Sequence, residues 1–141
     1  MRTLIKNGTC VTASEERDVT YAVLATHHAG CDGARQRIGP DCNAAIHRFC
    51  VAAGHVSGFG PAELGASSML VDCVGGGAAT AVATTFTELA THHPPCDGVG
   101  QRIGPDCNAA IHRFCRSRSF SSGFGPVESS GDGATVVCVS P

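Results

Sequence analysis

Eight of the nine cysteines in this 141-residue chain form two sets of four with the same spacing. Residues 26–50 read THHAGCDGARQRIGPDCNAAIHRFC, and residues 91–115 read THHPPCDGVGQRIGPDCNAAIHRFC, at an offset of 65 residues. The same offset relates SGFGPAE at 57–63 to SGFGPVE at 122–128. The two sets are Cys31, Cys42, Cys50 and Cys73, then Cys96, Cys107, Cys115 and Cys138. Cysteines at this density can form disulfides, bind a metal or remain thiols, and the elements around them decide which.

A helix is predicted over residues 40–50, introduced by Gly39-Pro40-Asp41. Proline suits the first helical position, and aspartate in the first turn interacts favourably with the helix dipole. At 100° per residue the helix is amphipathic, with about three turns and one face that is mostly apolar. That face carries Cys42, Ala45, Ile46, Phe49 and Cys50, and the other carries Asn43, Ala44, His47 and Arg48. Residues 105–115 repeat the pattern.

The helix restricts the cysteine pairing. Cys42 and Cys50 are eight residues apart, a separation of about 12 Å along a helix, which exceeds the ~7 Å Cα limit for a disulfide. Two connectivities therefore remain in each repeat, 31–42 with 50–73 or 31–50 with 42–73. Each bridge would contribute about 2–4 kcal/mol, which matters in a repeat of about 65 residues.

Zinc is the alternative use of these sulfur atoms, with His27, His28 or His47 as substitute ligands. The spacing disfavours it, because no C-x₂₋₄-C knuckle is present in the sequence. Free thiols are the third alternative. The ninth cysteine, Cys10, has Gly75 at its repeat position. It is interpreted as a small buried apolar residue, with an intermolecular disulfide as the alternative.

Composition excludes several classes of partner. The net charge is −2, charged residues are 16% and aromatic residues 5% of the chain. Without a basic stripe the chain is not expected to bind nucleic acid, and without an apolar run of about 20 residues it is not expected to insert into a membrane. Nine cysteines favour an extracellular or cell-surface location. The first 19 residues contain no visible signal peptide, which leaves the export route open.

The fold class expected is α+β, with two tandem ~65-residue disulfide-stapled repeats, each strand–helix–strand, related by pseudo-twofold symmetry. Extended segments are predicted at Val19–His28 and Thr84–His93, where threonine and aromatic residues favour strands. A Gly-Phe-Gly-Pro loop and a further strand follow each helix. Asn7-Gly8 predicts an N-terminal hairpin. The expected domains are 1–74, with this hairpin, and 75–141, linked at Gly75-Gly76-Gly77.

The polar residues of the repeated block are the candidate site. They lie on the polar side of the predicted helix or in the loop before it, and they offer planar donors and acceptors suited to sugar hydroxyls or a carboxylate. The alternative is a structural network, in which Asp41 caps the helix, Arg37 or Arg48 pairs with Glu63, and His47 packs over a disulfide. The candidate ligand-binding residues are Asp32, Arg37, Asn43, His47, Arg48, Asp97, Arg102, Asn108, His112 and Arg113.

Enzymatic chemistry is not expected. His27, His28 and His47 with Asp32 or Asp41 have the residue types of an acid–base site. The sequence nevertheless lacks G-x-S-x-G, H-E-x-x-H and a glycine-rich phosphate loop before a helix. Neighbouring histidines on a strand would also point to opposite sides. No catalytic residue, cofactor or metal is predicted.

The first 19 residues, MRTLIKNGTCVTASEERDV, resemble the N-terminal strands of the dihydropyrimidinase (hydantoinase) family of cyclic amidohydrolases. Activity in that family resides in a metal-bearing barrel of several hundred residues, which this chain lacks, so no function or catalytic residue is carried over. The repeat, CDG…QRIGPDCNAAIHRFC…SGFGP-x-E…C, resembles a small extracellular cysteine-rich module of no named family.

The sequence thus predicts a non-enzymatic, disulfide-stabilised tandem-repeat binding protein. Its expected partner is a glycan or another surface ligand, bound lectin-like at two equivalent sites with gain in avidity. A structural or self-assembling extracellular surface protein is the alternative, with self-association through Cys10 or exposed strand edges. A zinc-stabilised module is the third.

Overall fold

The computed structural model describes residues 2–6, 9–75 and 79–140. They fold into two compact units, Met1–Ala78 and Ala79–Pro141, which hold the first and the second repeat. Each unit combines two helices with an antiparallel sheet, so the expected α+β class is confirmed. The helices recur at the 65-residue offset, with α1 (Tyr21–His27) and α2 (Pro40–Ala52) matching α3 (Phe86–His92) and α4 (Pro105–Ser117).

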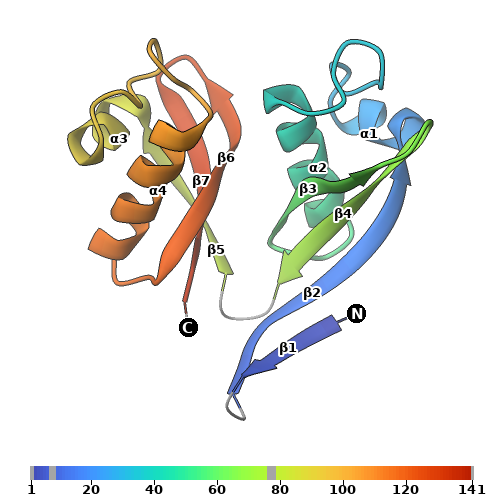
Figure 1. Cartoon of the computed structure of the whole chain (residues 1–141), viewed down its shortest axis with the longest axis horizontal. Coiled ribbons are helices and arrows are strands. Elements are labelled where there is room, and N and C mark those ends of the chain that lie inside the picture. Colours follow the sequence, from blue (N-terminus) through green and yellow to red (C-terminus); the bar gives the residue numbers. More distant parts are fainter. Residues whose placement is uncertain (1, 7–8, 76–78, 141) are drawn as a thin grey trace. The chain divides into compact units, whose positions relative to one another are not determined.

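The sheet of the first unit has the strand order β1-β2-β4-β3. In Figure 1, α2 lies along β3 and β4 on one face of this sheet. The short strand β1 pairs with the beginning of β2, from Thr9 to Ser14, and β4 pairs with β2 from Ala13 to Thr20. The predicted N-terminal hairpin is therefore present, and its turn at residues 7–8 lies outside the described residues. The strands are β1 (Arg2–Lys6), β2 (Thr9–Thr20), β3 (Ser57–Leu64) and β4 (Ser68–Gly75).

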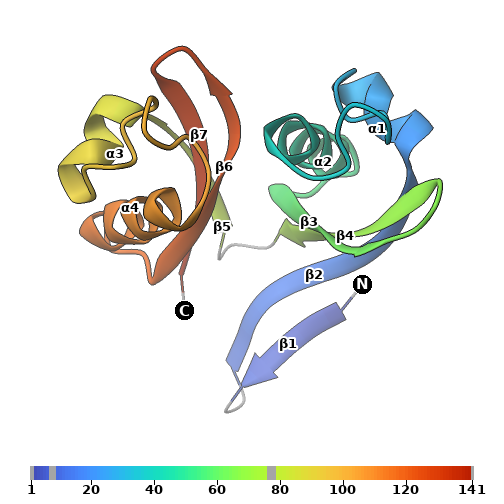
Figure 2. The same ribbon diagram turned by 45° about the horizontal axis from the view of Figure 1, so that its top comes forward.

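The sheet of the second unit has the order β5-β7-β6. Its strands are β5 (Ala79–Thr85), β6 (Ser122–Ser130) and β7 (Gly133–Val139). Figure 2 shows α3 and α4 together on one face of this sheet. Each repeat thus contains the expected strand–helix–strand order, with one short helix and one further strand in addition.

The short helices α1 and α3 correct a prediction, because Val19–His28 and Thr84–His93 are not extended throughout. The strand ends at a threonine that caps the helix: Thr20 Oγ1 accepts the N–H of Val23 at 3.2 Å. Thr85 Oγ1 accepts the N–H of Glu88 at 3.0 Å in the same way. Side-chain capping of this kind stabilises a helix by about 1 kcal/mol. The buried residues are then spaced by three, Tyr21 with Leu24 and Phe86 with Leu89, as on a helix face.

The predicted amphipathic helix is confirmed and extends two residues beyond position 50, to Ala52. Of the two connectivities expected in each repeat, the structure contains 31–42 with 50–73, and the second repeat forms the equivalent pairs. The disulfides are Cys31–Cys42, Cys50–Cys73, Cys96–Cys107 and Cys115–Cys138. On loop-closure grounds the bridges of sequence separation 11 and 23 stabilise the fold by about 3 and about 3.5 kcal/mol respectively. All eight cysteines are fully buried.

The Gly-Phe-Gly-Pro segment, predicted as a loop, is part of strand β3, with a register shift between Phe59 and Glu63. Phe59 stays 46% exposed, so it does not anchor a loop as a buried residue would. Gly58 pairs with Cys73 of β4 and leaves room for the neighbouring disulfide. A Cβ on Gly58 would lie 2.2 Å from Cys50 Sγ. The glycine of this motif therefore allows strand β3 to pass close to the Cys50–Cys73 disulfide.

Each repeat has its own core between its helices and its sheet. In the first, Leu24, Ile46 and Met69 pack around both disulfides. In the second, Phe86, Ile111 and Phe114 belong to the core cluster that holds both disulfides. Burying each of these side chains contributes about 1.5–3 kcal/mol. The disulfides therefore add to a real but small apolar core.

Candidate functional site

The loop between α1 and α2 is fixed by the Cys31–Cys42 disulfide and by Asp32. Asp32 Oδ1 accepts the backbone N–H groups of Ala34 at 2.9 Å and Arg35 at 2.7 Å, and the Arg35 guanidinium lies 3.2 Å from Oδ2. The hydrogen bonds from Arg35 and Ala34 lower the pKa of Asp32 below its ordinary value. Gly33 follows with φ +83°, where a Cβ would lie 2.9 Å from the Tyr21 ring. The Cys-Asp-Gly sequence thus builds a tight turn against Tyr21, in which the Asp32 carboxylate is paired with Arg35.

Arg37 ties this loop to the turn between β3 and β4. Its Nε donates to Tyr21 Oη at 3.1 Å, and its guanidinium carbon lies 5.1 Å from the centroid of the Tyr21 ring. Its Nη2 donates to the carbonyl oxygens of Gly65 and Ala66. The expected contact with Glu63 is thus replaced by contacts with the turn that follows it. Arg37 therefore has a structural role, because it connects the loop before α2 to the turn between β3 and β4.

These contacts surround an open pocket of about 500 Å³ in the first repeat. The size lies within the range of small-molecule sites. Its polar groups are the hydroxyls of Thr20 and Ser67 and the carboxylate of Asp32. The pocket is lined by Thr20, Tyr21, Ala22, Asp32, Gly33, Ala34, Ala66 and Ser67. Tyr21 is only 5% exposed, so it forms the floor and offers little surface for stacking.

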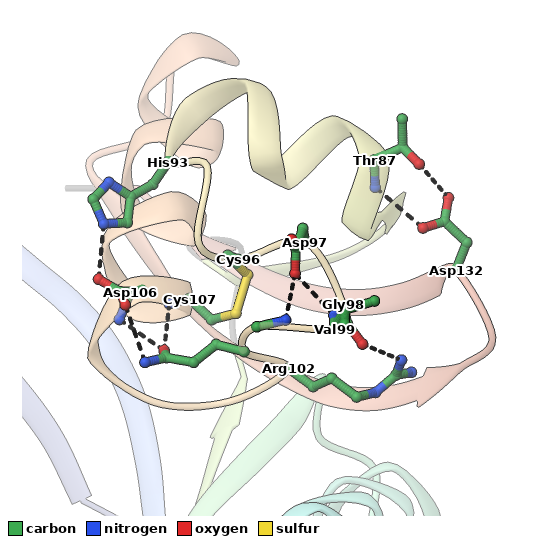
Figure 3. Close-up of a disulfide and its surroundings, with 12 residues drawn as sticks. Thr87, His93, Cys96, Asp97, Gly98, Val99, Arg102, Asp106, Cys107 and Asp132 are labelled. Atoms are coloured by element: carbon green, nitrogen blue, oxygen red, sulfur yellow. Dashed lines mark hydrogen bonds and ion pairs between the residues drawn. A yellow bond between two sulfur atoms is a disulfide. The ribbon is translucent and has the colours of Figure 1, made fainter.

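The second repeat builds the same loop with different surroundings (Figure 3). Asp97 Oδ1 accepts the N–H groups of Gly100 at 2.6 Å and Val99 at 2.9 Å, and these hydrogen bonds lower the pKa of Asp97. Arg102 donates to the carbonyl oxygens of Gly98 at 3.1 Å and Gly131 at 2.9 Å. Its guanidinium lies 4.4 Å from the centroid of the Phe86 ring. Asp97 and Arg102 therefore repeat the roles of Asp32 and Arg37.

The difference lies at Asp132, which reaches across to the start of α3 (Figure 3). The Thr87 hydroxyl donates to Asp132 Oδ2 at 2.8 Å, and the Thr87 N–H donates to Oδ1 at 3.2 Å. At the 65-residue offset, Thr87 corresponds to Ala22 and Asp132 to Ser67. Both of these residues line the pocket of the first repeat. The second repeat thus places a carboxylate of its own where the first has an open pocket.

The predicted site residues of the helices lie apart from this pocket. His47 Nδ1 is 2.8 Å from Ser57 Oγ at the start of β3, and Arg48 donates to the carbonyl oxygen of His27 at 2.9 Å. Asn43 is half-buried on α2. The pocket lining includes none of these three. In the second repeat, Asn108, His112 and Arg113 occupy the same positions, and the last two make the matching contacts, to Ser122 Oγ and to the carbonyl oxygen of His92.

Sequence reasoning missed Thr20 and Ser67 as pocket residues. The signal for Thr20 is its place one residue before an i, i+3 pair of large side chains, which is typical of a helix cap. Ser67 carries no such signal, because only the β3–β4 pairing brings it to the start of α1, where its carbonyl oxygen accepts the N–H of Tyr21 at 3.1 Å.

The adjacent histidines have separate partners. The His27 ring packs edge-on against Phe49 at 5.9 Å, whereas His28 Nε2 lies 3.6 Å from Asp41 Oδ1. The helix is capped by Gln36, whose Oε1 accepts the N–H of Asp41 at 2.9 Å, and not by the Asp41 side chain as expected. A joint site formed by His27 and His28 is therefore not assembled.

The zinc alternative needs the same eight sulfur atoms as thiolates, and in the structure they are paired with one another. Among the residues that the structure describes, no group of three or more His, Cys, Asp or Glu side chains is arranged to hold a metal ion. The side chain of Cys10 lies outside the described part of the chain.

Comparisons of the chain with protein-family models, with curated proteins and with solved structures find no match. Within the described ranges, no helix has the length and apolar character needed to cross a membrane. The four disulfides identify a disulfide-rich protein and are compatible with an extracellular location.

Proposed function

We propose that this chain is a non-enzymatic, extracellular or cell-surface binding protein whose first repeat binds a hydroxyl-rich ligand such as a saccharide unit. The open pocket beside Asp32 carries this proposal. A carboxylate held by backbone N–H groups is a fixed acceptor for sugar hydroxyls, and the Thr20 and Ser67 hydroxyls can both donate and accept. Because Tyr21 offers little exposed surface, hydrogen bonds would supply more of the affinity than stacking.

The disulfides support the binding role because they fix the pocket before the ligand arrives. Cys31 precedes Asp32 directly, and its bond to Cys42 holds the loop to α2. Cys50–Cys73 holds α2 to β4, the strand that follows the β3–β4 turn. A pocket that is already ordered loses less conformational entropy on binding. This construction also requires an oxidising compartment.

A glycan array probed with the oxidised, labelled chain tests the proposal. The wild type should retain a defined set of glycans. Ala34→Trp should lose them, because it places an indole at the pocket rim. Val99→Trp is the matched control at the equivalent position of the second repeat, where the side chain is 93% exposed, and it should bind like the wild type. Absence of any retained glycan, or equal binding by the two variants, would contradict the proposal.

Self-assembly is kept as the second candidate because of strand β5. This strand is at the edge of its sheet, and its sequence, ATAVATT, contains no charged residue or proline to discourage pairing with another chain. Light scattering coupled to size-exclusion chromatography tests it. A mass that rises with concentration in the wild type and remains monomeric in Ala81→Lys, a change at an exposed position of β5, would favour assembly, whereas a constant monomer mass would reject it.

A further inference from the structure

The duplication within the chain allows each feature of the pocket to be compared with its counterpart. The loop aspartate, the arginine beneath it and the disulfide are common to both repeats. Two exchanges alter the charge around the pocket. Ser67 stands where the second repeat has Asp132, and Arg35 stands where it has Gly100. Each exchange makes the first repeat more positive by one unit at neutral pH.

The carboxylate of Asp132 shows which chemical group this place accepts. It takes two hydrogen bonds from Thr87 and lies beside the same turn as Asp97 (Figure 3). Asp97 is satisfied by two backbone N–H groups, and Arg102 reaches the carbonyl oxygen of Gly131, the residue before Asp132.

The first repeat lacks the internal carboxylate and also the hydroxyl that binds it, because Ala22 stands at the position of Thr87. Ser67 and Thr20 offer hydroxyl donors at the pocket, and Arg37 reaches the turn just before Ser67. Arg35 adds a second guanidinium, ion-paired with Asp32 at 3.2 Å and with a side chain 73% exposed. A ligand carboxylate placed there would accept hydrogen bonds from neutral hydroxyls and lie in the field of two arginines, of which Arg35 is already paired with Asp32.

We propose that the ligand of the first repeat is a hexuronic acid unit, whose carboxylate takes the place that Asp132 fills in the second repeat, and that the second repeat binds none. This inference rests on the proposed function. The sugar hydroxyls contact Asp32, and the carboxylate contacts Ser67 and Thr20. One chain then binds one saccharide unit, and the avidity of two equivalent sites is absent.

The test is a titration of the ¹⁵N-labelled chain with sodium D-glucuronate and with D-glucose, followed by amide chemical shifts. Glucuronate should shift the amides of residues 20–22, 32–35 and 66–67 and leave their counterparts at 85–87, 97–100 and 131–132 unmoved. Its affinity should exceed that of glucose by about tenfold, which is the increment of one charge-assisted hydrogen bond. The difference should shrink as salt is raised.

Two transplanted variants sharpen the test. Ala22→Thr combined with Ser67→Asp copies the internal contact of the second repeat and should abolish the glucuronate shifts with no loss of thermal stability. The reverse set, Thr87→Ala with Asp132→Ser and Gly100→Arg, should make the second repeat respond to glucuronate, because it removes the internal contact and supplies the second guanidinium.

The outcomes separate this inference from the proposed function. Equal binding of glucose and glucuronate in the first repeat would overturn the hexuronate and leave the saccharide pocket standing. Failure of both sugars to shift any pocket amide would overturn both. Tighter binding of N-acetylglycine than of glucuronate would assign the pocket to a peptide carboxyl group and overturn the hexuronate.

Discussion

Replacement of Gly58 by alanine tests how closely the strand after α2 packs on a disulfide. A Cβ at this position would lie 2.2 Å from Cys50 Sγ and 2.8 Å from the backbone oxygen of Asp72. The sulfur is bonded to Cys73 and fully buried, and the oxygen belongs to the paired strand β4. Neither atom is the end of a flexible side chain, so the strand itself must move. The second repeat repeats the situation at Gly123.

The loss of folding stability expected for Gly58→Ala follows from these short contacts. One extra methyl group in a closed core destabilises a protein by about 1–3 kcal/mol, and contacts this short belong at the upper end. For a unit of this size, about 3 kcal/mol lowers the melting temperature by about 12–24 °C. Differential scanning calorimetry under non-reducing conditions measures the shift, and the intact mass shows whether all four disulfides have formed.

Gly75→Ala in β4 is the matched control, because a Cβ there would come no closer than 3.6 Å to its nearest neighbour, His55 Cδ2. Its melting temperature should remain within a few degrees of the wild type. A Gly58→Ala variant that forms every disulfide and melts at the same temperature as Gly75→Ala would refute the role assigned to this glycine.

Three further predictions concern the second repeat. Arg102→Ala removes two hydrogen bonds and the contact with the fully buried ring of Phe86, so the free energy of unfolding in urea should fall by about 1–3 kcal/mol. The control is Arg116→Ala on the exposed side of α4, which should change this free energy by less than about 0.5 kcal/mol. Thr85→Ala should cost about 1 kcal/mol through the lost helix cap, and an unchanged urea midpoint would contradict that cap. Asp97 has a lowered folded-state pKa, so its stabilising contribution is complete above the unfolded value of about 3.9 and is lost as pH falls through the folded pKa. Urea midpoints measured from pH 6 to pH 2 should therefore decline less steeply in Asp97→Asn, and parallel curves would contradict this.

The helix and the cysteine pairing were predictable because both depend on local spacing. Pro40 and the apolar positions from Cys42 to Cys50 define α2 without reference to the rest of the chain. The length of that helix then excludes one pairing of three. Selection of Cys31–Cys42 over the remaining alternative depends on the path of the loop, which has no signature in the sequence.

The first short helix could not be separated from a strand by composition. Threonine and tyrosine favour strands, and an alternating pattern fits Val19–His28 as well as a spacing of three does. The segment forms a helix because Thr20 caps its first turn and because Tyr21 and Leu24 are buried on the same face.

The candidate site was predicted in part. Asp32 lines the pocket and Arg37 supports its floor, whereas Asn43, His47 and Arg48 lie outside its lining. Helix periodicity marks these three as polar without showing which surface they reach. The difference between the repeats at Ser67 and Asp132 acquires meaning only through the β3–β4 and β6–β7 turns, which bring these residues to α1 and α3.

The central claim is that oxidised cysteines build the loop on which the pocket depends. Disulfide mapping of the non-reduced chain by proteolysis and mass spectrometry tests it most directly. Four bonds lower the mass by about 8 Da relative to the reduced chain and leave one of the nine cysteines open to alkylation. The peptides should link Cys31 to Cys42 and Cys50 to Cys73, with the same pairs in the second repeat. Links from Cys31 to Cys50, or nine alkylated thiols in the natively folded chain, would contradict the account.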